Sequence, residues 1–141
     1  MKRLRVALIL ISLFSTSFLW GQTTDNTSGI QFQELSFDEA LALAEKEDKL
    51  VFMDAFAVWC GPCKMLDRNT FPDEKVGEFF NERFISIKMD MEKGEGPELA
   101  KRYAVRAYPT LIVFHPNGKV AKKMLGYMTP EQLLIQMKEF D

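Results

Sequence analysis

The chain has 141 residues with 18 Lys and Arg against 20 Asp and Glu, and 47% of its residues are hydrophobic. This composition is that of one ordinary globular domain, and a formal net charge of -2 excludes the large basic surface typical of nucleic-acid binding. Two cysteines and one histidine exclude a disulfide-stapled mini-protein, and they cannot form a structural zinc site without carboxylates. We therefore expect no nucleic-acid partner, no metal and no cofactor.

Residues 1–21 have the pattern of a secretory signal peptide. Residues 1–5 carry three positive charges, and residues 6–19 form an uncharged, mainly apolar run. This run is shorter than the roughly 20 residues of a membrane-spanning helix, and a polar segment follows it, which favours export over an uncleaved membrane anchor. Cleavage after Gly21 would leave 15 basic against 20 acidic side chains, a net charge of -5. We expect a periplasmic or secreted protein.

A flexible linker is predicted to follow the signal peptide. Residues 22–29 are rich in Thr, Ser, Asn and Gly and show no hydrophobic periodicity, and we assign residues 22–31 to this linker. The remaining residues, 32–141, are enough to bury one hydrophobic core and form the single predicted domain.

Helical and extended patterns alternate along the domain. Because helices separate most of the strands, we expect parallel pairing there, whereas Pro116-Asn117-Gly118 predicts an antiparallel final hairpin. The predicted fold class is α/β, with a central mixed β-sheet flanked by helices. The patterns predict, in chain order, a helix over 37–48, a strand over 50–56, helices over 62–69 and 74–81, a strand over 84–90, a helix over 97–103, strands over 110–114 and 119–124, and a helix over 130–140. Five apolar residues are predicted to lie in the core: Phe79, Phe80, Phe84, Leu111 and Val113.

Cys60 and Cys63 are the residues that carry the chemistry. They follow a predicted strand and open a predicted helix, and their spacing places both sulfurs on one helix face within bonding reach. The start of a helix stabilises a thiolate, so Cys60 would attack a disulfide and Cys63 would resolve the mixed disulfide. Two alternatives are a static disulfide, whose small loop adds little stability, and half of a metal site that only His115 could extend.

The run Asp54-Ala55-Phe56-Ala57-Val58-Trp59-Cys60-Gly61-Pro62-Cys63-Lys64 resembles the active-site motif of the thioredoxin family, and Tyr108-Pro109-Thr110 before an apolar strand resembles a second motif of that family. The resemblance extends over residues 32–141 and implies the thioredoxin fold. Because Thr70-Phe71-Pro72-Asp73 follows the active-site helix, the chain looks most like the C-terminal domain of the membrane disulfide-reductant transporter.

The resemblance also implies roles for residues near the cysteines. Pro109 would be a cis proline facing the disulfide, and the backbone of Tyr108 would pair with a bound substrate chain. Trp59 would be partly exposed and would shape the substrate groove together with Gly61 and Pro62. The alternatives are a trans proline at a strand edge and an aromatic side chain that simply belongs to the core.

Asp54 is an acidic residue inside an otherwise apolar strand. An unpaired buried carboxylate is costly, so Asp54 should either reach water or remain protonated with a raised pKa. The resemblance matches it to the buried acid that exchanges a proton with the resolving cysteine, here Cys63. The family often has a lysine near this acid; the aligned residue is Ser86, and Lys88, which faces the same side, could replace the lysine.

These features predict an exported thiol:disulfide oxidoreductase that reduces protein disulfides. We expect a monomer that receives electrons from a membrane or soluble thiol donor. Two other classes stay open, namely a non-catalytic thioredoxin-fold binding or chaperone module and a thiol reductant for cytochrome c maturation. The pair Gly61-Pro62 resembles reducing thioredoxins, but no sequence rule sets the reduction potential.

Overall fold

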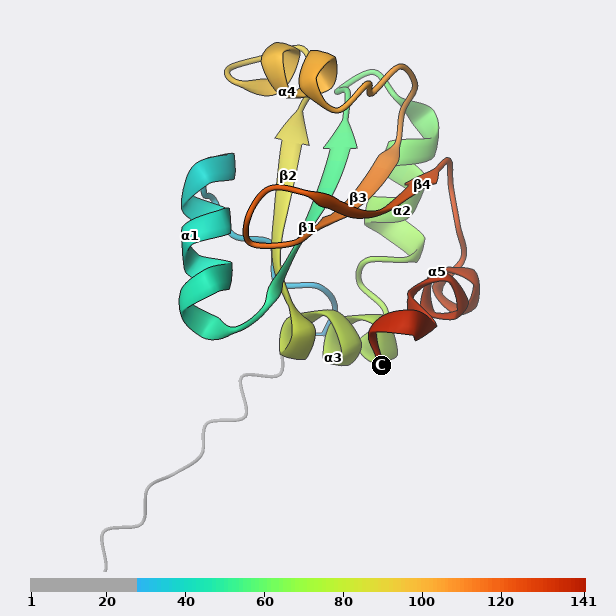
Figure 1. Cartoon of the computed structure of the whole chain (residues 1–141). Coiled ribbons are helices and arrows are strands. Elements are labelled where there is room, and N and C mark those ends of the chain that lie inside the picture. Colours follow the sequence, from blue (N-terminus) through green and yellow to red (C-terminus); the bar gives the residue numbers. More distant parts are fainter. Residues whose placement is uncertain (1–27) are drawn as a thin grey trace, which may run out of the picture.

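The computed structural model describes residues 28–141 and contains one four-stranded sheet (Figure 1). The strands are β1 (Leu50–Phe56), β2 (Phe84–Asp90), β3 (Thr110–Phe114) and β4 (Val120–Leu125), in the spatial order β2-β1-β3-β4. The predicted signal peptide and most of the predicted linker lie outside the described residues. Within residues 28–141, no helix combines the length and apolar character needed to cross a membrane.

Five helices accompany the sheet, at positions close to those predicted. Two of them begin with a capping box, in which Ser36 pairs with Glu39 and Thr129 pairs with Gln132. The last helix stops earlier than predicted, and the final three residues before the C-terminus tighten into a 3-10 turn. The helices are α1 (Phe37–Glu47), α2 (Gly61–Asn69), α3 (Glu74–Arg83), α4 (Gly96–Arg102) and α5 (Pro130–Met137).

The helices cover both faces of the sheet, and each face has its own apolar cluster. Along β1 the side chains alternate between the two faces. Val51 and Met53 pack toward α1 and α4, whereas Phe52 packs toward α2, α3 and α5. Of the predicted core residues, four are buried, and Phe79 is only half-buried. The alternation places Asp54 on the same face as Phe52, the face that α2 covers.

The direction of β3 differs from the prediction. The β1–β2 pair is parallel and the β3–β4 pair is antiparallel, as predicted, but β3 runs antiparallel to β1. The seven residues of α4 span only about 10 Å, less than half the length of a seven-residue strand. Helix α4 therefore lies across the carboxyl ends of β1 and β2 (Figure 1), and the chain enters β3 from that same end.

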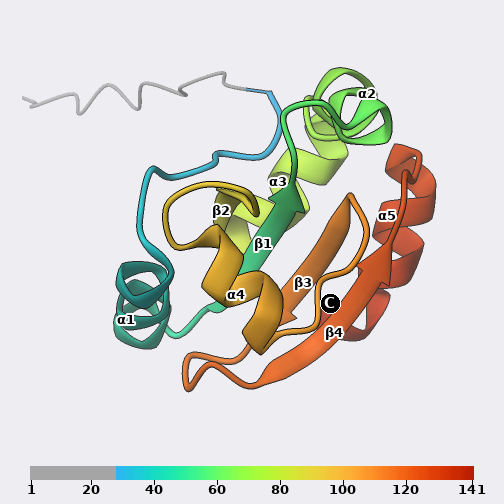
Figure 2. The ribbon, with the colours of Figure 1, turned by 90° about the horizontal axis from the view of Figure 1, so that it is seen from above.

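The N-terminal strap, which we define as residues 29–35, is attached to the domain, so the prediction of a flexible linker over residues 29–31 is wrong. Gly29 and Ile30 are buried, and the Ile30 N–H donates to the carbonyl of Phe71 (2.8 Å). The Asn81 side chain donates to the Gly29 carbonyl (3.0 Å) and accepts from the Gln31 N–H (2.8 Å). The strap, blue in Figure 2, leads to α1.

The strap then follows the β2 edge of the sheet. Phe32 forms a single parallel bridge with Ser86, and the N–H of Gln33 donates to the Ser86 carbonyl (2.8 Å). Strand β2 is the outer strand on this side. The strap therefore satisfies part of an otherwise unpaired strand edge.

A close backbone contact explains the glycine at the start of the strap. Gly29 has a φ of 94°, a conformation that L side chains rarely adopt. On the facing helix, a Cβ added to Gly77 would lie 2.5 Å from the backbone of Gly29. The two glycines thus let the strap touch α3 directly. The composition of residues 22–29, which is rich in small polar residues, does not predict this packing.

We predict that Gly77→Ala destabilises the protein by about 1–3 kcal/mol, because the added methyl group must displace the strap. Alanine is favoured in helices by about 1 kcal/mol over glycine, so a loss of stability would identify the contact as the cause. Chemical denaturation measures the effect. The control is Gly61→Ala, whose Cβ would meet no atom within 4 Å, and equal stability of the two variants would contradict the prediction.

Candidate active site

A disulfide joins Cys60 to Cys63 at the point where the chain leaves the carboxyl end of β1 and enters α2. Cys60 is the N-cap of α2, and Gly61 and Pro62 follow in the first turn. The N–H of Cys63 donates to Sγ of Cys60 (3.2 Å). Because this N–H and the positive end of the helix both face Sγ, the site favours the thiolate form of Cys60 once the disulfide is reduced.

A short loop brings Tyr108 and Pro109 to the disulfide. The Tyr108–Pro109 peptide bond is cis, which is the isomer that the resemblance implies. Tyr108 packs against the small apolar cluster formed by Ala57 and both cysteines. The Pro109 carbonyl accepts a hydrogen bond from the N–H of Gly126 (2.9 Å), which joins the residue before β3 to the residue after β4.

Trp59 is exposed, so it is not a core residue. Its side chain is 64% exposed, and its indole N–H donates to both carboxylate oxygens of Glu92 (3.0 Å each). Its ring meets the ring of Tyr108 edge to face, with 5.8 Å between the centroids. The sequence analysis did not identify Glu92. The only local sequence feature that indicates a turn at this position is Asp90, the last residue of β2. Its side chain accepts a hydrogen bond from the Glu92 N–H (3.0 Å).

Several exposed apolar side chains lie on the segments next to the disulfide. Among residues 28–141, six large hydrophobic side chains are exposed, and four of them belong to the segments that surround the cysteines. Val58 and Trp59 precede Cys60, Met65 follows on α2, and Leu125 pairs with the first residue of β3. An exposed apolar rim of this kind is suited to contact with another protein chain.

Asp54 is completely buried in the centre of the sheet. Its Oδ2 accepts a hydrogen bond from Lys88 Nζ (2.9 Å), while its Oδ1 has no hydrogen-bond partner within the described part of the chain. Burial raises the pKa of Asp54 from 3.8 to about 6, although the positive charge of Lys88 opposes the rise. Of the two alternatives expected for Asp54, access to water is wrong because the residue is buried, and the raised pKa is found. Asp54 is therefore mainly ionised at pH 7 and protonated below pH 6.

Lys88 takes the place of the family lysine, while Ser86 is buried with no partner for its hydroxyl among residues 28–141. Lys88 lies opposite Asp54 in the β1–β2 register and also contacts the carboxylate of Asp67 on α2. Burial alone would lower the pKa of Lys88, but these two carboxylates outweigh it and raise the pKa. The ammonium therefore stays charged.

Asp67 connects this ion-pair cluster to the active-site helix. It stands four residues after Cys63, so the two side chains lie on the same face of α2. Since Lys88 contacts both Asp67 and Asp54, the buried acid lies beneath the helix face that carries Cys63. The sequence analysis missed Asp67, although its spacing from Cys63 was a usable signal.

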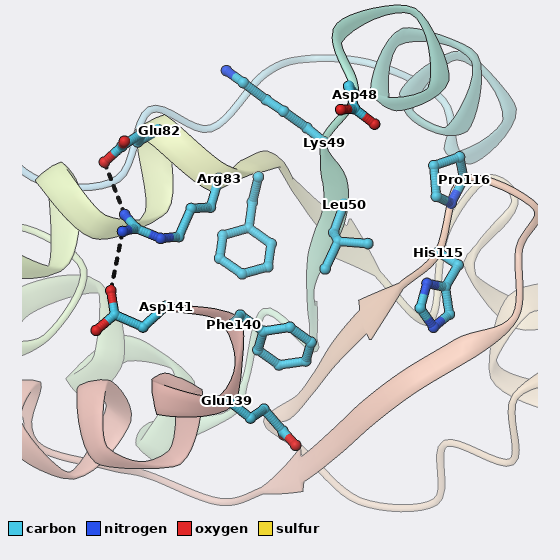
Figure 3. A pocket seen from close by; sticks show the side chains of 11 residues that line it. Asp48, Lys49, Leu50, Glu82, Arg83, His115, Pro116, Glu139, Phe140 and Asp141 are labelled. Carbon is cyan, nitrogen blue, oxygen red and sulfur yellow. Dashed lines mark hydrogen bonds and ion pairs between the residues drawn. The ribbon is translucent and has the colours of Figure 1, made fainter.

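A cavity of about 670 Å³ lies at the opposite end of the sheet (Figure 3). It is formed where β1 and β2 begin and β3 ends, so it is separate from the disulfide. Arg83 crosses it and pairs with Glu82 and Asp141. His115 also lines it, which places the single histidine far from the cysteines. In the described part of the chain, no three His, Cys, Asp or Glu side chains form a potential metal site.

Comparison with known proteins agrees with this arrangement. Residues 37–141 match the family model of the thioredoxin-like domain. The chain is 36% identical over 103 residues to chloroplastic thioredoxin Y of Oryza sativa subsp. japonica, covering 73% of this chain and 56% of that protein. It is 29% identical over 141 residues to the thiol:disulfide interchange protein DsbD of Haemophilus ducreyi, covering 90% of this chain and 25% of that protein. The chain thus spans about half or less of the length of these relatives.

Two solved structures are also similar. A putative disulphide-isomerase from Bacteroides thetaiotaomicron has a TM-score of 0.70 and 50% identity, over 79% of this chain and 93% of that one. The oxidised C-terminal domain of DsbD from Neisseria meningitidis has a TM-score of 0.62, over 80% of this chain and 100% of that one. At 24% identity, this second likeness shows the fold alone.

We predict that the Cys60 thiol of the reduced protein titrates below the ~8.5 of a free cysteine, because its thiolate faces the start of α2 and the Cys63 N–H. Cys63 stays largely protonated at neutral pH. The rate of alkylation as a function of pH, with each modified cysteine identified by mass spectrometry, measures both. An alkylation profile without a step below pH ~8 would refute the prediction.

Proposed function

We propose that this chain, which belongs to the family of thioredoxin-like domains, is an exported thiol:disulfide oxidoreductase that reduces protein disulfides. The observation that carries the proposal is the Cys60–Cys63 pair at the start of α2, next to cis Pro109 and within an exposed apolar rim. The relationship to proteins named thioredoxin and thiol:disulfide interchange protein supports the same chemistry.

In the first step, the Cys60 thiolate attacks one sulfur of a substrate disulfide. A bond forms between Cys60 Sγ and that sulfur, while the substrate disulfide breaks and its second sulfur leaves as a thiolate. The product is a mixed disulfide between Cys60 and the substrate. In the second step, the Cys63 thiolate attacks Cys60 Sγ, which forms the Cys60–Cys63 disulfide and releases the first substrate sulfur. Two electrons thus pass from the cysteine pair to the substrate.

Asp54 is the proposed acceptor of the Cys63 proton in the second step. Lys88 donates a hydrogen bond to Oδ2, and the buried Oδ1 has no hydrogen-bond partner in the described structure. Oδ1 can therefore accept a proton. A pKa of about 6 keeps Asp54 ionised at pH 7 yet close enough to neutrality to exchange a proton. A carboxylate with an ordinary pKa would be a weaker base.

The substrate chain is proposed to bind on the apolar rim around Val58 and Met65. The backbone of Tyr108, which precedes cis Pro109, would pair with the extended substrate, while Gly61 and Pro62 leave space above the disulfide. Trp59 would form one side of this binding surface, and its hydrogen bonds with Glu92 hold the ring in place. This arrangement recognises an exposed polypeptide segment rather than a small molecule.

Export is proposed from residues 1–21, whose positively charged start and uncharged apolar run are typical of a signal peptide. After export, the oxidised Cys60–Cys63 pair needs a membrane or soluble thiol donor that reduces it after each cycle. An insulin-reduction assay with a dithiol supply tests the activity, because a non-catalytic binding module would give no turnover. The measured reduction potential of the pair tests the direction of the reaction.

We predict that Cys60→Ser abolishes turnover, whereas Cys63→Ser accumulates stable mixed disulfides with partner proteins. The reason is that Cys60 forms the bond with the substrate and Cys63 breaks it. Partners captured from the exported fraction are compared by non-reducing electrophoresis before and after reduction. The double variant is the control for non-covalent binding. Equal capture by the two single variants would contradict the division of roles.

We predict that Asp54→Asn slows release of the mixed disulfide at pH 7 and at the same time stabilises the fold. A carboxyl whose pKa rises from 3.8 in the unfolded chain to about 6 in the fold costs roughly 3 kcal/mol once ionised. The stability that protonated Asp54 contributes is fully present below pH 3.8 and is lost as the pH rises through about 6. The gain from asparagine is therefore largest above pH 7 and shrinks toward pH 4.

Denaturation at several pH values and single-turnover release kinetics measure the two effects of Asp54→Asn. The control is Glu78→Gln, an exposed acid on α3, which leaves both quantities unchanged. If Asp54→Asn loses stability and keeps full turnover, Asp54 is a structural acid, and its role as proton acceptor is withdrawn.

A further inference from the structure

Three phenylalanine rings surround the ammonium of Lys88. Its Nζ lies 5.3 Å from the ring centroid of Phe32, 5.1 Å from that of Phe56 and 5.2 Å from that of Phe71. The rings come from three separate segments, namely the N-terminal strap, the end of β1 and the connection after α2. All three distances are within the roughly 6 Å over which a ring face attracts a cation.

We propose that Phe32, Phe56 and Phe71 form an aromatic cage that holds the Lys88 ammonium on Oδ2 of Asp54, and that Phe32 is a positioning residue for the active site. The proposal rests on the role proposed above for Asp54. A lysine side chain has four rotatable bonds and loses considerable conformational entropy when it is fixed. The three rings of the cage attract the ammonium, while Oδ1 of Asp54 has no hydrogen-bond partner within the described residues.

Competing carboxylates explain why a cage is needed. Lys88 borders a cavity of about 550 Å³, and Glu34 of the strap and Asp90 of β2 line the same cavity. Asp67 faces the ammonium from α2, and Asp54 faces it from β1. Because the Lys88 side chain is 26% exposed, it could also turn outward toward the carboxylates of the cavity. The rings favour the inward position, where the ammonium contacts both Asp54 and Asp67.

Phe32 is held in the cage by the strap. The bridge between Phe32 and Ser86 places Phe32 beside β2. Ser86 lies two residues before Lys88 on that strand. The Phe32 ring meets the ring of Phe71 edge to face, with 5.1 Å between the centroids, and is tilted against the ring of Phe52 at 6.3 Å. The backbone contacts of Gly29 and Gln33 therefore determine the position of a ring that acts on the active site.

Phe32→Leu tests the cage, because leucine preserves an apolar cover over Lys88 but removes the ring face. We expect the pKa of Asp54 to rise above about 6, since the lysine that opposes the rise is held less firmly. The Asp54 carboxyl carbon, followed by NMR in the oxidised protein, reports this pKa without any catalysis. The matched control is Phe79→Leu, which removes a half-buried ring from beneath Arg83 (4.5 Å) and leaves the Asp54 titration unchanged.

A second series tests the ring attraction without a change of shape. Replacing Phe32 with phenylalanines that carry one, two and three fluorine atoms weakens the ring's attraction for a cation step by step. We expect the pKa of Asp54 to rise in the same order. Release of the mixed disulfide should slow about threefold at pH 6 and remain unchanged at pH 8. Phe32→Tyr, which keeps the ring face, retains the original titration.

The outcomes separate the cage from the proposed function. An Asp54 titration that does not change in Phe32→Leu or in the fluorinated series overturns the cage, whatever the activity. A titration that moves without any change in release kinetics supports the cage and removes Asp54 from the proton transfer. Equal titration changes in Phe32→Leu and Phe79→Leu would show a general effect of lost packing and would also overturn the cage.

Discussion

The active end of this molecule depends on a carboxylate that is buried inside its central sheet. A carboxylate without water is costly, so its neighbours must supply a counter-charge. Lys88 supplies the charge from the adjacent strand, and Asp67 ties the same ammonium to the active-site helix. The pKa of Asp54 then lies near 6, because burial and ion pairing act in opposite directions. This balance is what the proposed proton transfer from Cys63 to Asp54 requires near neutral pH.

The path of the chain gathers the remaining groups at one end of the sheet. Because α4 is short, β3 starts at the end where β1 finishes, and Tyr108, which precedes Pro109, packs there against the two cysteines. The turn after β2 reaches the same end and carries Glu92 to Trp59. The contact between Gly29 and α3 attaches the strap, which carries Phe32 to Lys88.

Local sequence patterns predicted the elements and the cysteine chemistry, but not every long-range contact. Capping residues such as Ser36 and Thr129 act within one helical turn, and the two-residue period of a strand was enough to select Lys88. The direction of β3 depends on whether α4 is long enough to return the chain to the other end of the sheet, and no local sequence pattern predicts this. The packing of Gly29 was hidden because a polar, glycine-rich segment has the composition of a linker whether or not it touches the domain.

The features that break ordinary rules of stability lie along one face of the sheet. Asp54 is a buried acid with one unpartnered oxygen, and Ser86, on the neighbouring strand, is a buried hydroxyl without a partner in the described structure. Lys88, which lies opposite Asp54 in the β1–β2 register and two residues after Ser86, is a partly buried cation. Proteins keep such costly groups where function requires them. Since Phe32 covers this face from the strap, the segment that joins the domain to its N-terminal region is also part of the environment that sets the acidity of the active site.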